Sequence, residues 1–170
     1  ASNTVTTLAG NTVALVQSNP GANNFVTMIP SPVAGTLTVP ANTLTAGSKV
    51  RFFISGFFSI LTSSTFSFRL RMDGVTIYTS STSTATGATV SNKRMFCVGG
   101  WNIFTTGVSG TMLGYGMMDA ATVSVTTTST ATTTYDTTAT HTFDIQLAYS
   151  ASNAANAFTV TSFELEIAKI

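Results

Sequence analysis

Apolar and polar residues alternate along much of the chain, most clearly between residues 35 and 78. Successive side chains of a β-strand point to opposite faces, so alternation predicts a strand with one buried face. Two long strands are expected here, over 49–60 and 66–72. Their inward-facing residues are Val50, Phe52, Ile54, Phe58 and Ile60 in the first, and Phe66, Phe68, Leu70 and Met72 in the second.

Two glycine-containing positions punctuate this stretch. Asp73-Gly74 is the residue pair that suits a two-residue hairpin turn, which predicts that the chain returns along Val75 and Ile77. Gly56 interrupts the apolar face of the first strand, where a glycine indicates a bulge or the close approach of another backbone.

The alternation of apolar and polar residues predicts strands in the rest of the chain as well, and no segment has the pattern of an amphipathic helix. Further strands are expected over 13–16, 25–29, 36–39, 94–104, 112–118, 123–135, 141–149 and 158–170. Strands at this spacing indicate an all-β protein, an antiparallel β-sandwich, and long crossing connections make it a jelly roll of about 8–10 strands. Residues 1–34 are expected as an N-terminal extended segment with short strands, and residues 35–170 as the jelly-roll domain. One shared core is predicted from Phe52, Ile54, Phe66, Phe68, Leu70, Phe143, Ile145, Leu147, Phe163 and Leu165.

Composition supports a folded β-protein and excludes two partner classes. Charged residues make up 8% of the chain, against about a quarter in ordinary soluble domains. Threonine, roughly one residue in five, replaces them and favours strands, while 44% hydrophobic content provides a core. The net charge of +1 and the lack of a basic arm argue against nucleic-acid binding. No apolar run approaches the ~18 residues of a membrane span, so no membrane partner is expected.

Residues that carry chemistry are scarce. The single histidine, His141, follows a polar loop and is expected as an ordinary surface side chain, with Asp136 and Asp144 near it in sequence but at no recognised ligand spacing. The single cysteine, Cys97, lies in an apolar run and is expected as a small buried hydrophobe. No nucleophile elbow or phosphate-binding loop is present. The sequence therefore predicts no enzyme, no catalytic residue, no metal site and no cofactor.

Three groups of residues are candidates for binding. Phe53 and Phe57 point opposite to the core face, and a second apolar face indicates a cover, either another subunit or a segment of the same chain. Two pairs of like charges also point outward, Arg69 with Arg71 on one strand and Glu164 with Glu166 on another. These side chains either pair with charges on neighbouring strands or subunits or are simply solvated. The candidate subunit interface therefore contains Phe53, Phe57, Arg69, Arg71, Glu164 and Glu166.

The third group is Trp101 with Tyr115, in a glycine-rich hairpin. Exposed aromatic rings there would offer a sugar-stacking platform, whereas core packing is the simpler interpretation for Trp101. The flanking residues Phe96, Val98, Ile103 and Phe104 are apolar on both faces, which favours a strand buried on both sides.

Two segments resemble jelly-roll domains of virion surface and capsid-associated proteins, especially those of tailed phages. The resemblance rests on TLTVPANTLTAGSKVRFFISGFFS followed by FSFRLRMDGVTIY, and on HTFDIQLAYSASNAANAFTVTSFELEI at the end of the chain. It covers about residues 35–78 and 141–170. It implies a cement, spike or fibre-head protein with a tumour-necrosis-factor-like jelly roll, located in the virion. The lack of a basic arm departs from the coat proteins of small RNA viruses and argues against genome packaging.

These observations predict a non-enzymatic virion structural protein that forms homo-oligomers. The expected partners are identical subunits, with a trimer favoured, and other virion proteins. The alternative is a carbohydrate-binding, lectin-like β-sandwich module with a host-surface glycan as partner. Exposure of Trp101 and Tyr115 would discriminate between the two.

Overall fold

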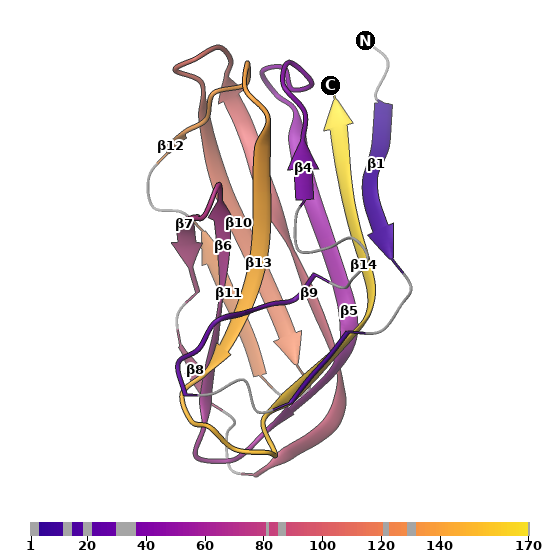
Figure 1. Cartoon of the computed structure of the whole chain (residues 1–170), viewed down its shortest axis with the longest axis vertical. Helices are drawn as coiled ribbons and strands as arrows, with labels where there is room; N and C mark the ends of the chain where they lie inside the picture. The colour runs from indigo at the N-terminus through magenta and orange to yellow at the C-terminus, as the bar shows by residue number, and fades with distance from the viewer. Residues whose placement is uncertain are drawn as a thin grey trace.

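Two antiparallel β-sheets pack face to face in the computed structural model (Figure 1). The structure describes residues 4–11, 15–18, 22–29, 37–80, 82–84, 88–120, 123–128 and 132–169, and these contain fourteen strands and no helix. Sheet A consists of β1 (Thr4–Asn11), β2 (Leu15–Ser18), β5 (Lys49–Ile60), β9 (Val90–Thr105), β10 (Thr111–Ala120), β11 (Val123–Thr128), β12 (Thr133–Thr134) and β14 (Ala157–Lys169). Sheet B consists of β3 (Val26–Thr27), β4 (Leu37–Val39), β6 (Thr65–Met72), β7 (Val75–Thr79), β8 (Ser83–Thr84) and β13 (His141–Tyr149).

The strand order is that of a jelly roll. The chain folds back at the β6–β7 hairpin, so that β5 pairs with β9, β4 with β13 and β1 with β14. The β14–β5 pairing then joins these strand pairs into sheet A, and the β13–β6 pairing joins them into sheet B, as in a jelly roll. The β10–β11 hairpin follows β9 and widens sheet A. The predicted all-β sandwich is thus confirmed.

Strands near the N-terminus join both sheets. β1 and β2 pair with β14, and β3 pairs with β13. The predicted boundary between residues 34 and 35, and Val13 at the start of an expected strand, lie outside the described residues. The long strands β5 and β13 have the bounds expected from the alternation.

The space between the sheets is filled by one cluster of buried apolar side chains. All ten residues predicted for the core belong to it, so this prediction is confirmed. Aromatic rings from opposite sheets meet there: Phe58 and Phe66 lie 4.9 Å apart edge to face. Fully burying a side chain of this size contributes about 1.5–3 kcal/mol, so the inward faces of β5, β6, β13 and β14, together with those of β9 and β10, stabilise the fold.

Both predicted glycine positions behave as expected. Asp73 and Gly74 have φ values of 49° and 80°, which a tight hairpin between β6 and β7 requires. A Cβ atom on Gly56 would lie 1.8 Å from the Thr159 carbonyl oxygen, so no other residue fits this approach of β14 to β5. The β5–β14 register shifts between Val160 and Ser162, next to this contact.

Candidate functional site

The outer face of sheet A, turned away from the core, carries the best candidate for a binding surface. We define it by the outward residues of β14, β5, β9 and β10. Two adjacent rows of side chains cross it in register, Glu166–Arg51–Gly100–Tyr115 and Glu164–Phe53–Val98–Met117. The face therefore brings together residues from three distant parts of the sequence.

Phe53 and Phe57 are exposed on this face. Their exposed fractions are 43% and 37%, whereas Phe52 and Phe58, their neighbours on the same strand, are 2% and 1% exposed. The prediction that these two rings point away from the core is confirmed. Phe57 lies opposite Arg94 and Phe53 lies opposite Val98 in the pairing of β5 with β9, so the apolar surface continues onto β9.

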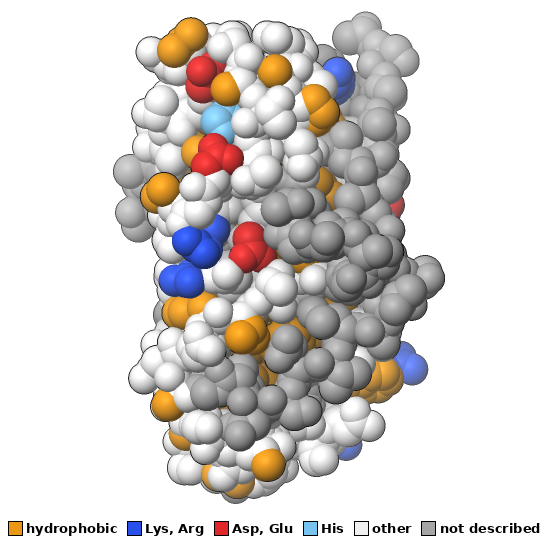
Figure 2. All heavy atoms as spheres, in the orientation of Figure 1, with side chains coloured by type: hydrophobic (Ala, Val, Ile, Leu, Met, Phe, Trp, Pro, Cys, Tyr) orange, Lys and Arg blue, Asp and Glu red, His pale blue; other side chains and the backbone are white. Residues whose placement is uncertain are grey.

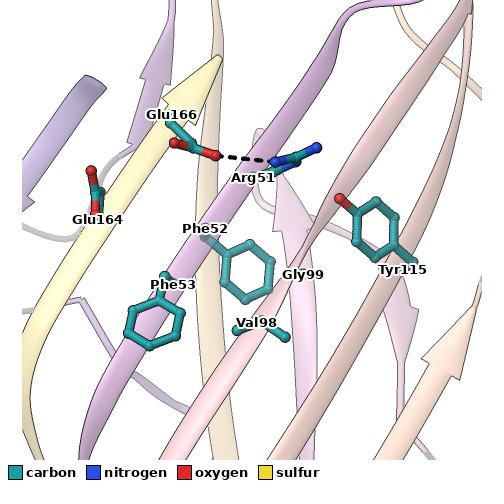
Figure 3. A pocket seen from close by; sticks show the side chains of 8 residues that line it. All are labelled: Arg51, Phe52, Phe53, Val98, Gly99, Tyr115, Glu164 and Glu166. Carbon is teal, nitrogen blue, oxygen red and sulfur yellow. Dashed lines mark ion pairs between the residues drawn. The ribbon is translucent and has the colours of Figure 1, made fainter. Parts of the chain in front are cut away.

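A hollow of about 280 Å³ opens beside Phe53 (Figure 3). Figure 3 shows Glu164 and Glu166 along β14 on one side, Tyr115 on the other, and Arg51 between them. The lining is completed by Phe52, Phe53, Val98 and Gly99. We call this feature the hollow.

An ion pair crosses one side of the hollow. Arg51 Nη1 lies 3.5 Å from Glu166 Oε1, with 48% and 27% of the two side chains exposed, so water screens the pair. Burial raises the pKa of the Tyr115 phenol, and the Arg51 guanidinium, which donates a hydrogen bond to it, opposes that rise. The hollow is therefore bordered by carboxylates, a guanidinium and aromatic rings, a combination that suits polar or cationic groups with an apolar side.

Arg69 and Arg71 lie elsewhere, on the outer face of sheet B. Their strand neighbours are Gln146 and Asp144. Arg69 Nε donates to Gln146 Oε1 at 2.7 Å, and its guanidinium stacks 4.0 Å from the centre of the Phe25 ring. Figure 2 shows basic and acidic side chains gathered together on this face. The arginine ladder and the glutamate ladder thus face opposite sides of the molecule and do not pair with each other within one chain.

The carboxylate in this sheet B cluster is well satisfied. Asp144 accepts hydrogen bonds from Thr27 Oγ1 at 2.7 Å and from Gln146 Nε2 at 2.5 Å. Burial nevertheless raises its pKa, against the effect of those bonds and of both arginines. These contacts fasten β3 onto sheet B and give the cluster a structural role.

Trp101 lies in the core. It is 0% exposed and stacks on Phe143 at 3.8 Å, from the opposite sheet. Core packing, the simpler interpretation, is confirmed, and Trp101 presents no face to a glycan. The expectation that this strand is buried on both sides is wrong. Ile103 is buried, but Phe96 and Val98 are only partly buried and Phe104 is 49% exposed, because they lie on the outer face of sheet A. Tyr115, the second glycan candidate, is partly exposed and borders the hollow.

The interpretation of His141 as an ordinary surface residue is wrong. It is 8% exposed, with Nδ1 2.6 Å from Asp73 Oδ2 and Nε2 2.7 Å from the Asp136 carbonyl oxygen. The Asp136 carbonyl can only accept, so Nε2 donates to it. The ring also contacts Tyr135, with ring centres 4.6 Å apart.

Sequence alternation placed Phe53, Glu164 and Glu166 outward but did not bring Arg51 and Tyr115 to them. Alternation within the strand 49–60 does place Arg51 on the same outward face as Phe53, so its position beside Phe53 could have been predicted. Tyr115 needed the β9–β10 register, in which Gly100 separates it from Arg51. Cys97 is buried as expected, and burial raises the pKa of its thiol to about 12.

Two further kinds of site are absent from the described residues. No three His, Cys, Asp or Glu side chains there converge on a point where a metal ion would bind. No helix of membrane-spanning length and hydrophobicity occurs in this part of the chain either.

Comparison with known proteins adds little. No family model matches the chain, and no curated protein matches it. Among solved structures, the chain is similar to dimeric latent PorU from Porphyromonas gingivalis, with a TM-score of 0.33 and 11% sequence identity. The match covers 92% of this chain and 12% of the PorU chain. At this TM-score the likeness carries no argument about function.

Proposed function

We propose that the protein is a non-enzymatic structural component of a virion, a capsid-associated cement, spike or fibre-head protein, that assembles as a homo-oligomer. The observation that carries the proposal is the exposure of Phe53 and Phe57 on the outer face of sheet A. The partners are identical copies, three in number by the resemblance described above, and other virion proteins.

The physical argument starts from the cost of an uncovered apolar face. Each Å² of apolar surface removed from water contributes about 25 cal/mol, and a specific interface buries roughly 800 Å² per partner. A contact centred on Phe53 and Phe57 would also cover Val98, which is partly exposed beside Phe53. With 8% charged residues, identical copies meet with little repulsion between like charges.

The carbohydrate-binding alternative depended on two exposed rings. Trp101 is buried against Phe143, so only Tyr115 is left on the surface. The observations therefore favour assembly over glycan binding.

Assembly is tested by measuring mass in solution. Sedimentation velocity should give a defined oligomer for the natural chain and a folded monomer for Phe53→Ser with Phe57→Ser. Val75→Ser with Val108→Ser is the matched control, because these valines are 69% and 70% exposed. Val75 is the first residue of β7 in sheet B, and Val108 lies in the turn between β9 and β10. A natural chain that stays monomeric at high concentration would overturn the proposal.

Location is tested separately. An antibody raised against the chain should label the outer surface of purified particles in immunogold electron microscopy. Particles in which mass spectrometry finds no peptide of this chain would rule out a virion protein, whatever its oligomeric state.

A further inference from the structure

Two opposite charges border the apolar surface on the outer face of sheet A. Arg94 lies opposite Phe57 in the β5–β9 pairing, and Asp119 lies opposite Phe96 in the β9–β10 pairing. Arg94 is exposed, whereas Asp119 and Phe96 are partly exposed. The face therefore presents one guanidinium and one carboxylate at the same end as its aromatic rings.

Neither charge is paired among the described residues. Met95 and Met118, their neighbours on β9 and β10, are 3% and 0% exposed, so strand alternation directs Arg94 and Asp119 outward. The two are diagonal neighbours on adjacent strands, about 7–8 Å apart between Cα atoms. Within this part of the chain they nevertheless form no ion pair with each other or with another side chain.

A subunit that covers Phe57 and Phe96 also covers both charges. Removing a charge from water without pairing it weakens an interface, because its lost hydration is not replaced. A second copy of the chain supplies the opposite charge for each, since every copy carries one Arg94 and one Asp119. A planar guanidinium and a carboxylate pair through two charge-assisted hydrogen bonds, which also fixes the relative orientation of the copies.

We propose that Arg94 of one copy pairs with Asp119 of a neighbouring copy, beside the apolar contact made by Phe53 and Phe57. This inference rests on the proposed function, since it takes the outer face of sheet A as the subunit interface. Each copy gives one guanidinium and one carboxylate, so a closed assembly leaves neither charge without a partner.

Charge reversal tests the pairing. Arg94→Glu and Asp119→Arg should each raise the dissociation constant of the oligomer about tenfold or more, because each places like charges together in every contact. Lys93→Glu is the matched control: Lys93 lies opposite the inward-facing Phe58, so it makes the same change of charge on a side chain that points away from this face. A dissociation constant that Arg94→Glu raises no more than Lys93→Glu would overturn the pairing.

Mixing the two reversed chains shows whether the pair forms between copies. In a contact between one chain of each kind, the glutamate at position 94 meets the arginine at position 119, and the natural Arg94 meets the natural Asp119. The mixture should therefore dissociate about threefold or more less readily than either variant alone. A pair formed within one chain, or a variant that fails to fold, gains nothing from mixing, and such a result would overturn the inference.

A crosslinking measurement locates the contact without reversing a charge. Chains carrying Arg94→Cys are mixed with chains carrying Asp119→Cys, and a short crosslinker specific for thiols should join one of each. The natural Cys97 is buried and does not react. Crosslinks formed equally within each unmixed variant would contradict the pairing.

The outcomes separate this inference from the proposed function. If Phe53→Ser with Phe57→Ser abolishes assembly and every charge variant assembles normally, the pairing of Arg94 with Asp119 is wrong and the apolar interface stands. If the natural chain is a monomer, both fall together.

Discussion

The Tyr78 hydroxyl donates a hydrogen bond of 2.8 Å to the backbone carbonyl of Tyr115, linking β7 of sheet B to β10 of sheet A. Tyr78 is 7% exposed, and its ring occupies a slot that two glycines of β10 leave open. A Cβ atom on Gly114 would lie 2.7 Å from the ring, and one on Gly116 would lie 2.7 Å from the hydroxyl oxygen. The glycines in the segment predicted as an ordinary strand therefore leave room for the Tyr78 side chain to pack against β10.

Alanine at either glycine should destabilise the protein. Overpacking of this kind costs about 1–3 kcal/mol. In a Tyr78→Phe background the penalty for Gly116→Ala should fall, because the atom it meets first has been removed. The penalty for Gly114→Ala should stay unchanged, because that Cβ meets ring carbons. Urea denaturation of the three single and two double variants checks this, and an equal penalty for Gly116→Ala in both backgrounds would contradict it.

Phe68 and Phe53 offer a matched pair for the core. Phe68 is 0% exposed and Phe53 is 43% exposed. Truncating Phe68 to alanine should cost about 3–5 kcal/mol of unfolding free energy, whereas Phe53→Ala should cost below about 1 kcal/mol in the monomer. Chemical denaturation at a concentration where the chain is monomeric measures both. Comparable losses would show that the faces of the sandwich are assigned the wrong way round.

Alternation of residue types was sufficient to predict the long strands, their buried faces and the sandwich, because these depend on neighbours two residues apart. Phe52, Phe53 and Phe68 show this directly. Alternation did not predict β1, which pairs with β14. It could not predict contacts between segments far apart in the chain. Asn156 is one example: it is 0% exposed and its amide bonds to Leu61 N, Ser64 Oγ and the Ala151 carbonyl. Nothing in its small-residue loop indicates that it fastens the β5–β6 turn.

The candidate site was predictable in part for the same reason. The alternation of residues along each strand predicted that Phe53 points outward and that Glu164 and Glu166 lie together on one face of the last strand. Trp101 and His141 illustrate the limit. Their partners Phe143 and Asp73 lie far away in the sequence, and only the packing of the sheets and the pairing of strands bring them together. His141 and Asp73 are 68 residues apart in sequence and 2.6 Å apart in space.

The Asp73–His141 pair should make stability depend on pH in acid. Burial alone would raise the pKa of Asp73, but hydrogen bonds from Thr142 and His141 outweigh burial and lower it. A carboxylate with a lowered pKa adds stability above its unfolded pKa, about 3.9, and loses that contribution as pH falls through the folded value. The difference in melting temperature between the natural chain and Asp73→Asn should therefore be at its full size above about pH 5 and shrink as pH falls below the unfolded pKa. A difference that is constant over this range would show that the charge of Asp73 is not involved.

Trp101 provides the last test, between a lectin and a scaffold. The ring stacks 3.8 Å from Phe143 across the sheets, so Trp101→Ala removes a buried aromatic contact and should cost about 3–5 kcal/mol. Binding to a glycan array should be the same for the variant and the natural chain, measured well below the melting temperature of the variant. Tyr115→Ala is the useful comparison, because this ring borders the hollow and is partly exposed. Glycan signals that disappear with Trp101→Ala while the fold is retained would restore the carbohydrate-binding alternative. Signals that disappear only with Tyr115→Ala would place a sugar in the hollow.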